Sequence, residues 1–441
     1  MFYHSSQVTK ILFQSISELE RQPEKYAVDP SKCFVRHRKL PFHFMTRILL
    51  TMAATSTYGE MRKHFLYRKD MPTVSAFLQQ KDKILPHAYA HLLAMFNARF
   101  PPRLHRGKYL LHAVDGSSFE IFRDPRDHET YFGPREQAKR GFNLLHAVMQ
   151  YDLLSSRFDD MILQPGRKMN EPAALCALAD RARNNAHKTI FIADRGFSGY
   201  NVYAHMEEND QAYVIRVKDL HVSWMLYGVS RSLPDTVDTT VNRILSRSQA
   251  KSKRIHPERE EDYRYISDNV AFDFLTPECP EYHLTLRVVR FRLENGQYEN
   301  LVTNLSKDEF SAKELMKIYH KRWDIETAFD QLKNAIGAIA FHSKKRRGVE
   351  LELWIRLVFL NYCAAIAQTA DKIAQKTKKH PYKVNFSNLV KDCRLFLTHN
   401  QETGPPGHAV LLPCSFLPVR TGRMYPRPRH FRKPVSFAHR I

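Results

Sequence analysis

The chain has 441 residues, of which 43% are hydrophobic and 12% aromatic, so it is long enough for two or three globular domains and is not a disordered protein. Its formal net charge is +22, a balance typical of proteins that bind a polyanion. Residues 1–100 carry 15 basic and 7 acidic side chains, and residues 371–441 carry 14 and 3, so most of the positive excess lies at the two ends.

The six cysteines and the apolar segments exclude several classes of protein. The cysteines are scattered without a C-x-x-C pair or a Cys/His ligand spacing, so the chain is neither a zinc module nor a disulfide scaffold. The N-terminus lacks the pattern of a secretory signal. The longest apolar stretch, residues 351–370, is interrupted by Glu352 and Arg356, which predicts a buried helix and not a membrane span. We therefore expect a soluble protein of a reducing compartment that binds nucleic acid and no membrane.

Residues 1–104 are predicted to form a helical DNA-binding domain. Three stretches have helical periodicity, and two basic segments, RHRK (36–39) and MRKHFLYRKD (61–70), lie between them. Basic side chains interleaved with His and Tyr suit contacts with DNA phosphates. The alternative is a helical bundle with an ordinary solvated basic surface.

The pattern changes to β at Lys108, and residues 105–204 are predicted to be the first part of an α/β core. The expected elements are, in chain order, a strand, a turn and a second strand in KYLLHAVDGSSFEIF (108–122), strands in GFNLLHAVMQYD (141–152) and MILQ (161–164), a helix in EPAALCALADRARNNA (171–186), and a central strand in KTIFIADRG (188–196). These strands are expected to supply their own core, so that residues 1–100 would be separable from the rest.

Three further segments complete the chain. Residues 205–305 are predicted to be a β-rich insertion with an Asn-Gly hairpin signal at 295–296. Residues 306–370 are predicted to be the second part of the core, entered through a helix with a capping box that starts at Ser311. Residues 371–441 are predicted to form a basic helix and a Pro/Arg-rich tail.

One helix in the second part of the core carries polar side chains at an unusual spacing. In IYHKRWDIETAFDQLKNAIG (318–337), four of them share an arc of roughly 60° when the segment is drawn as an α-helix of about 100° per residue. These side chains are Tyr319, Arg322, Glu326 and Lys333. The stripe could hold metal and phosphate together, or it could be an ordinary ion-paired helix face. Asp330 falls almost beside Glu326, so helical geometry alone allows either as an acid of the same site.

Two further acids stand at the ends of buried strands. Asp115 follows the apolar run YLLHAV, and Asp194 follows TIFIA. Strand ends at the rim of an α/β sheet are where its sites form, although each acid alone is more commonly a turn residue or a helix cap. Together with Glu326 they predict a site rich in oxygen ligands that suits Mg²⁺, with two ions expected.

The same residues carry a resemblance to a known family. DGSS (115–118), DRGFSGYN (194–201) and the spacing Y-x2-R-x3-E-x6-K within residues 319–333 are similar to the signature of bacterial insertion-sequence DDE transposases of the YREK type. The resemblance covers residues 108 to about 340 and is specific because the aspartate motifs and the four-residue spacing occur together. It implies a ribonuclease H-like mixed sheet with flanking helices, interrupted by the β-rich insertion and preceded by the all-α N-terminal domain.

For this chain the resemblance also implies an activity and its partners. Asp115, Asp194 and Glu326 would be catalytic and would bind Mg²⁺, for which Mn²⁺ can substitute. Tyr319, Arg322 and Lys333 would contact DNA. The implied activity is the binding of insertion-sequence ends followed by metal-dependent strand cleavage and strand transfer, in a cut-and-paste transposition that can pass through a hairpin intermediate. The expected partners are double-stranded DNA, as element ends and target, and a second copy or a larger synaptic complex, with no small-molecule cofactor, in the bacterial cytoplasm at the nucleoid.

Two alternatives remain open from the sequence. One is a ribonuclease H-like nuclease without a strand-transfer step, which the long insertion and the two basic ends disfavour. The other is a non-catalytic DNA-binding repressor derived from a transposase, which the presence of all three acids disfavours.

Overall fold

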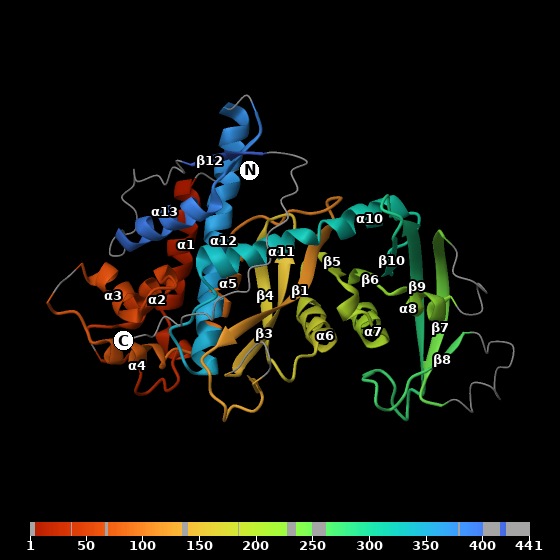
Figure 1. The fold of residues 1–441 in the computed structure, drawn as a ribbon, viewed down its shortest axis with the longest axis horizontal. Coiled ribbons are helices and arrows are strands. Elements are labelled where there is room, and N and C mark those ends of the chain that lie inside the picture. The colour runs from red at the N-terminus through yellow and green to blue at the C-terminus, as the bar shows by residue number, and fades with distance from the viewer. Residues whose placement is uncertain are drawn as a thin grey trace.

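The computed structural model describes residues 5–36, 38–66, 69–134, 140–183, 185–226, 235–248, 262–377, 380–399 and 415–419, and the fold is given for these (Figure 1). Helices from the beginning and the end of the chain lie at one end of the molecule, and a long sheet extends from them toward the other (Figure 1). The Pro/Arg-rich tail is expected from about Gly404, and all of it except residues 415–419 lies outside the described residues.

The first hundred residues fold into short helices. They are α1 (Ser5–Glu20), the 3-10 helix η1 (Pro23–Tyr26), α2 (Phe42–Thr51), α3 (Thr57–Phe65), α4 (Val74–Lys81) and α5 (His87–Ala98). The side chains of Ser56 and Thr73 cap α3 and α4, because each accepts a hydrogen bond from a backbone N–H in the first turn. Apolar side chains on the inner faces of these helices are fully buried.

A mixed sheet begins at β1, and nine of its strands follow the order β2-β3-β1-β5-β6-β10-β9-β7-β8, with β4 paired to β3. The strands of its first part are β1 (Tyr109–Ile121), β2 (Tyr131–Phe132), β3 (Phe142–Asp152), β4 (Arg157–Pro165), β5 (Lys188–Ala193) and β6 (Ala212–Arg216). β1 is antiparallel to β3 and parallel to β5, and β5 is parallel to β6. The helices α6 (Glu171–Ala182) and α7 (Tyr200–Glu208) pack on one face of this part of the sheet.

The predicted turn at DGSS was wrong, because β1 continues through it as one strand. Its ladder with β3 runs without interruption from His112 to Ile121. The local turn chemistry of Asp115-Gly116 is overridden by this long-range pairing. The predicted helix in EPAALCALADRARNNA and the predicted central strand in KTIFIADRG are confirmed as α6 and β5.

The strands between the second aspartate and the last helices extend the same sheet. They are β7 (Val237–Ser246), β8 (Tyr263–Tyr265), β9 (Glu281–Arg292) and β10 (Tyr298–Thr303), and the short helix α8 (Asp219–Met225) precedes them. β10 pairs with β6, so these strands continue the core sheet at its edge. The hairpin expected at residues 295–296 is confirmed between β9 and β10, where Gly296 has a φ of 80°.

The segment drawn as one helix over residues 318–337 is divided in the structure. Its parts are α10 (Ala312–His320), α11 (Trp323–Asp330) and a π-helical turn (Gln331–Ile336). Ser311 caps α10 by accepting a hydrogen bond from the backbone N–H of Glu314. The expectation of one regular helix was therefore wrong, because the last turn is wider than an α-helical turn. α10 and α11 run across one end of the core strands (Figure 1).

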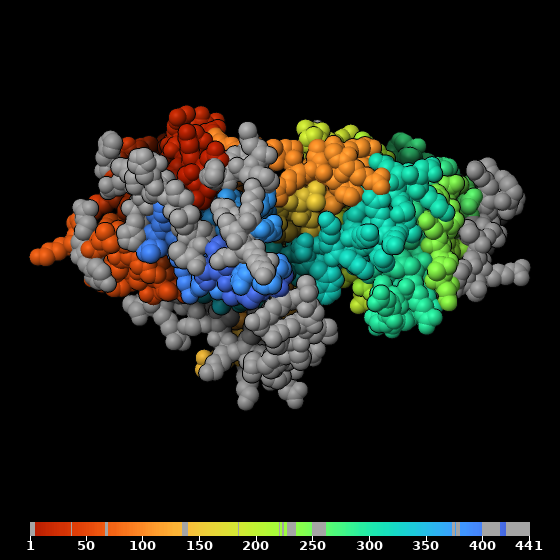
Figure 2. Space-filling view, turned by 90° about the horizontal axis from the view of Figure 1, so that it is seen from above, coloured from red at the N-terminus to blue at the C-terminus, as the bar shows by residue number. Residues whose placement is uncertain are grey.

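The remaining elements are α12 (Arg346–Thr377), α13 (Phe386–His399) and a two-stranded sheet of β11 (Tyr382–Val384) and β12 (Phe416–Pro418). The predicted buried helix at 351–370 is confirmed as the middle of α12. None of the helices described here is both long and apolar enough to cross a membrane. In Figure 2, α13 lies against the N-terminal helices.

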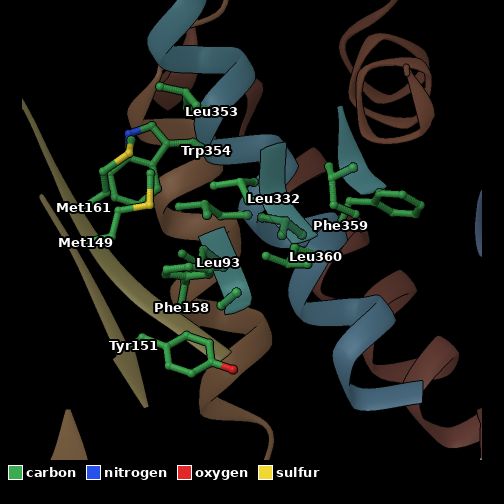
Figure 3. Packing of buried hydrophobic residues seen from close by; sticks show 14 of the residues in the cluster. Leu93, Met149, Tyr151, Phe158, Met161, Leu332, Leu353, Trp354, Phe359 and Leu360 are labelled. Atoms are coloured by element: carbon green, nitrogen blue, oxygen red, sulfur yellow. The ribbon is translucent and has the colours of Figure 1, made fainter. Parts of the chain in front are cut away.

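One hydrophobic core joins the N-terminal helices to the sheet. Figure 3 shows Leu93 of α5 beside Phe158 of β4 and Leu332 of the π-helical turn, with side chains of α12 around them. A buried ion pair reinforces this contact, since Lys81 Nζ of α4 lies 2.6 Å from Glu352 Oε1 of α12. The structure therefore gives no support to the expectation that residues 1–100 are separable from a core that packs by itself.

Candidate active site

The two predicted aspartates directly follow the last paired residues of the parallel ladder between β1 and β5. That ladder ends where Val114 pairs with Ala193. Asp194 follows the end of β5 and leads into the 3-10 turn η2 (Arg195–Phe197), whereas Asp115 lies inside β1. The prediction that Asp115 ends its strand was therefore wrong, because the pairing with β3 carries β1 on to Ile121. The sheet register still brings the two residues next to each other, at the point where the parallel pairing ends.

Arg322 links the first aspartate to the acid of the helix. Its Nη1 lies 3.1 Å from Asp115 Oδ2, and its Nη2 lies 3.1 Å from Glu326 Oε1. The Arg322 side chain is only 7% exposed, whereas that of Glu326 is 41% exposed. The Nε atom of Arg322 is buried and has no hydrogen-bond partner among the described residues. The guanidinium therefore stands as a cation between two carboxylates that come from a strand and a helix.

Tyr319 contacts the second aspartate. Its hydroxyl donates a hydrogen bond to Asp194 Oδ1 at 3.2 Å, and its side chain is buried. Burial and the neighbouring charge of Asp194 raise the pKa of Tyr319 to about 12. The phenol consequently keeps its proton at neutral pH and acts as a donor.

The other two candidates on this segment point to different partners. Lys333 Nζ donates to the backbone oxygen of Ser118, which follows Asp115 on β1, at 3.0 Å. Asp330 instead accepts a hydrogen bond from Asn334 Nδ2 at 2.7 Å. Of the two acids that the helical wheel left open, it is Glu326 that shares Arg322 with Asp115.

Several charges act on the pKa values at the site. Burial raises the pKa of Asp115, and so do the charges of Glu326 and Glu171, while the Gly116 N–H and Arg322 oppose the rise. Burial alone would lower the pKa of Arg322, but Tyr319 and Asp115 outweigh it and raise that pKa. Burial is thus the main reason that the pKa of Asp115 is raised, and the two neighbouring carboxylates add to it.

The donor set fits a hard divalent ion. Asp115, Asp194 and Glu326 offer only carboxylate oxygens, which Mg²⁺ and Mn²⁺ prefer. The guanidinium of Arg322 forms ion pairs with two of them, Asp115 and Glu326. In this arrangement the three acids could bind such an ion once the guanidinium releases its carboxylates.

A tighter group of possible ligands lies elsewhere among the described residues. The ligand atoms of His112, Asp152 and Asp159 all lie within 4.8 Å of one another. His112 precedes Asp115 by three positions on β1, so the two side chains point to opposite faces of the sheet. Burial would lower the pKa of His112, but Asp159 and Asp152 outweigh it and raise that pKa. This group is therefore best described as a buried ion pair, separate from the three acids.

Two residues that the sequence did not single out also lie at the site. Glu171 begins α6, and its carboxylate lies beside Gly116 and Gly196, the glycines that closely follow the two aspartates. His146 of β3 contacts Glu171 Oε1 through Nε2 at 3.1 Å. The sequence offered only a weak signal, since an acid in the first turn of a helix is ordinary.

Known proteins that are similar to this chain are transposases. Residues 106–362 match the family described as transposase DDE domain. InsL of insertion sequence element IS186A from Escherichia coli (strain K12) and the transposase for insertion sequence element IS421 from Escherichia coli are each 28% identical over 245 residues, which is 53% of this chain. The match spans 62% of each relative, so this chain covers less than two thirds of their length.

A weaker likeness is found among solved structures. The piggyBac transposase synaptic complex with hairpin DNA aligns with a TM-score of 0.47 and 12% identity, over 91% of this chain and 81% of that one.

Proposed function

Since the chain belongs to the transposase DDE domain family, we propose that it is the transposase of an insertion sequence and that Asp115, Asp194 and Glu326 are its catalytic acids. The observation that carries the proposal is the convergence at one rim. The end of the parallel ladder between β1 and β5 brings the two aspartates together, and Arg322 ties Asp115 to Glu326 with two contacts of 3.1 Å. An ordinary ion-paired helix face would not need to meet two strands in this way.

The three acids would hold Mg²⁺, or Mn²⁺ in its place, most simply as two ions. Such ions activate a water or a 3′-hydroxyl and stabilise the leaving oxygen during phosphodiester cleavage and strand transfer. The acids themselves would fix the positions of the ions. Their rigidity comes from β1, β5 and α11, and each of these elements is anchored in a buried core.

The polar residues around the acids have separate roles in the proposal. Arg322 exchanges its carboxylates for a DNA phosphate, to which its planar fork can bind with two hydrogen bonds. Tyr319, with its proton retained, donates to an oxygen of the same strand of DNA. Lys333, beside the backbone of Ser118, adds positive charge near the scissile phosphate. These assignments make the chain a transposase of the YREK type.

The partners follow from charge and from the reaction. The two basic ends of the chain would bind double-stranded DNA as element ends and target, and a second copy would hold the other end in a synaptic complex. The first cut leaves a 3′-hydroxyl that can attack the opposite strand, so a hairpin intermediate is compatible with the site. A nuclease without strand transfer would use the same acids, and a repressor would need none of them.

The test uses the full chain and a supercoiled plasmid that carries the DNA flanking the gene. We expect Mg²⁺-dependent cleavage and joined products from the wild type. Asp115→Asn, Asp194→Asn and Glu326→Gln should each abolish both, and binding to the same DNA should persist because the acids hold metal and not DNA. Asp330→Asn is the matched control on the same helix and should remain active.

Three outcomes would contradict the proposal. Cleavage that survives in any of the three variants removes that acid from the site. Cleavage without joined products indicates a nuclease. DNA binding without cleavage by the wild type indicates a repressor.

A further inference from the structure

Glu171 is connected to the strand that carries the first aspartate through a buried histidine. Glu171 Oε1 lies 3.1 Å from His146 Nε2, and His146 Nδ1 lies 3.1 Å from Ser118 Oγ. The His146 side chain is 7% exposed and that of Glu171 is 31% exposed. A series of side-chain hydrogen bonds therefore links β1 through β3 to the first turn of α6. This series fixes the orientation of the Glu171 carboxylate.

The Glu171 carboxylate lies over the backbone that follows both aspartates. A Cβ atom at Gly116 would lie 2.2 Å from Glu171 Oε1, and a Cβ atom at Gly196 would lie 3.0 Å from Oε2. Gly116 directly follows Asp115, and Gly196 is two residues after Asp194. One oxygen thus lies against each of the two glycines, in space that exists only because both residues lack a side chain.

The helix alone does not account for this placement. An acid in the first turn is favoured by the helix dipole wherever the side chain points. Here the side chain instead turns toward the backbone beside two other carboxylates, those of Asp115 and Asp194. Like charges gathered at one rim cost free energy unless a cation binds among them.

We propose that Glu171, oriented by His146, is a positioning residue of the catalytic centre, which holds the backbone after Asp115 and Asp194 in place and strengthens divalent-cation binding. This inference rests on the proposed function, because it assigns Glu171 to the metal site of the same three acids. Glu171 acts through the backbone at Gly116 and Gly196 and through its charge. Residues in this outer position commonly change metal affinity by about 10- to 100-fold when they are replaced.

The first test measures Mn²⁺ binding to the full chain by electron paramagnetic resonance of the free ion. Glu171→Gln keeps the shape of the side chain and removes its charge, so we expect half-saturation to need about tenfold more Mn²⁺. His146→Gln should have the same direction of effect, and the thermal unfolding midpoint should stay at the wild-type value in both. Asp180→Asn is the matched control, because Asp180 is an acid of the same helix that pairs with a different histidine, His205.

The second test asks whether the carboxylate and the glycine act together. Gly196→Ala should weaken Mn²⁺ binding in the wild type, since the added methyl group would press on Glu171 Oε2. In the Glu171→Ala background the same change should have little further effect. Independent sites would instead add their effects.

The outcomes separate this inference from the proposed function. If Mn²⁺ binds with unchanged affinity after the combined replacement of Asp115, Asp194 and Glu326, both the proposed function and the role of Glu171 are overturned. Binding that needs those acids, together with wild-type affinity in Glu171→Gln, would overturn only the role of Glu171. A loss of affinity that merely follows a lowered unfolding midpoint, or additive effects of Gly196→Ala and Glu171→Ala, would also reduce Glu171 to a structural residue.

Discussion

At the scale of single residues, Arg322 shows how one side chain can serve two states of a site. It bridges two acids while buried, and the same planar fork suits a phosphate. Its charge satisfies Asp115 and Glu326 before metal and DNA bind. The carboxylates of Asp115 and Glu326 therefore stay close together. The guanidinium of Arg322 must then compete with the divalent ion for these carboxylates.

Replacing this arginine with lysine separates charge from geometry. In Arg322→Lys one ammonium group cannot contact both Asp115 and Glu326 with the same fork. Losing one charge-assisted hydrogen bond of about 1.5 kcal/mol corresponds to about a tenfold fall in the rate of DNA cleavage. Single-turnover cleavage measures the rate, and Mn²⁺ binding to the same variant should persist. A variant that cleaves at the wild-type rate would show that the fork is not needed.

Part of the site could be predicted from single residues, and part could not. Asp115 and Asp194 could be singled out because each follows an apolar run, and the structure brings the two residues next to each other although β1 continues past Asp115. Glu171 and His146 were missed because their meeting depends on how α6 packs over β1 and β3, which no local pattern encodes. The bridge from Arg322 to two acids was missed for the same reason, since only Glu326 is close to it in sequence.

At the scale of elements, two predictions made from local sequence were wrong because contacts between distant segments determine the structure there. The Asp-Gly-Ser-Ser segment has the composition of a turn, yet pairing with β3 keeps it in a strand. The wheel for residues 318–337 assumed one regular helix, but the structure has a wide π-helical turn at Gln331–Ile336. The apolar periodicity identified the helical segment, whereas its exact winding depends on contacts with other elements.

A histidine clamp between elements makes stability depend on pH. His205 of α7 lies 2.9 Å from Asp180 of α6 through Nδ1 and 2.9 Å from Asp273, in the loop before β9, through Nε2. Partial burial alone would lower the pKa of His205, but Asp273 and Asp180 outweigh this effect and raise that pKa.

Cys176 lies near the same two acids. Burial and the charges of these acids raise the pKa of its thiol to about 12, so the thiol stays neutral.

The sign of the pH effect follows from the raised pKa of His205. The stabilisation by His205 should be complete below its ordinary value of about 6.5 and should be lost as the pH rises through the higher folded-state value. We expect His205→Gln to be less stable than the wild type at pH 6 and the difference to shrink toward pH 9. Urea unfolding at a series of pH values measures it. A difference that does not change with pH would show that the clamp is held by uncharged hydrogen bonds.

At the scale of the whole molecule, buried charges join the two ends of the chain. The Lys81 and Glu352 side chains are 1% and 4% exposed, and Glu352 also contacts Arg356 and His342. Burial would raise the pKa of Glu352, but Lys81, His342 and Arg356 outweigh it and hold that pKa well below its usual range. Removing one cation would leave the carboxylate poorly compensated in a dry interior.

Two lysines allow a matched comparison of this effect. Lys81→Ala should lower the free energy of unfolding by about 3 kcal/mol, since it breaks a buried ion pair. Lys345 pairs with Asp82 at 2.8 Å, but its side chain is 74% exposed. Lys345→Ala should therefore change the free energy of unfolding by less than about 1 kcal/mol. Urea denaturation gives both values, and equal losses would contradict a special role for the buried pair.

The shared core predicts that the N-terminal helices cannot be removed from this protein. Without residues 1–100, α12 would lose the contact with Leu93 of α5 and the ion pair between Lys81 and Glu352. We expect the full chain to lose its helical circular dichroism and its tryptophan fluorescence in the same transition, and the truncated chain to show no cooperative transition. A truncated chain that unfolds cooperatively and still binds Mn²⁺ through Asp115, Asp194 and Glu326 would contradict this expectation. In that case the helices would be a separable DNA-binding unit, as the strand pattern that starts at Lys108 predicts from the sequence alone.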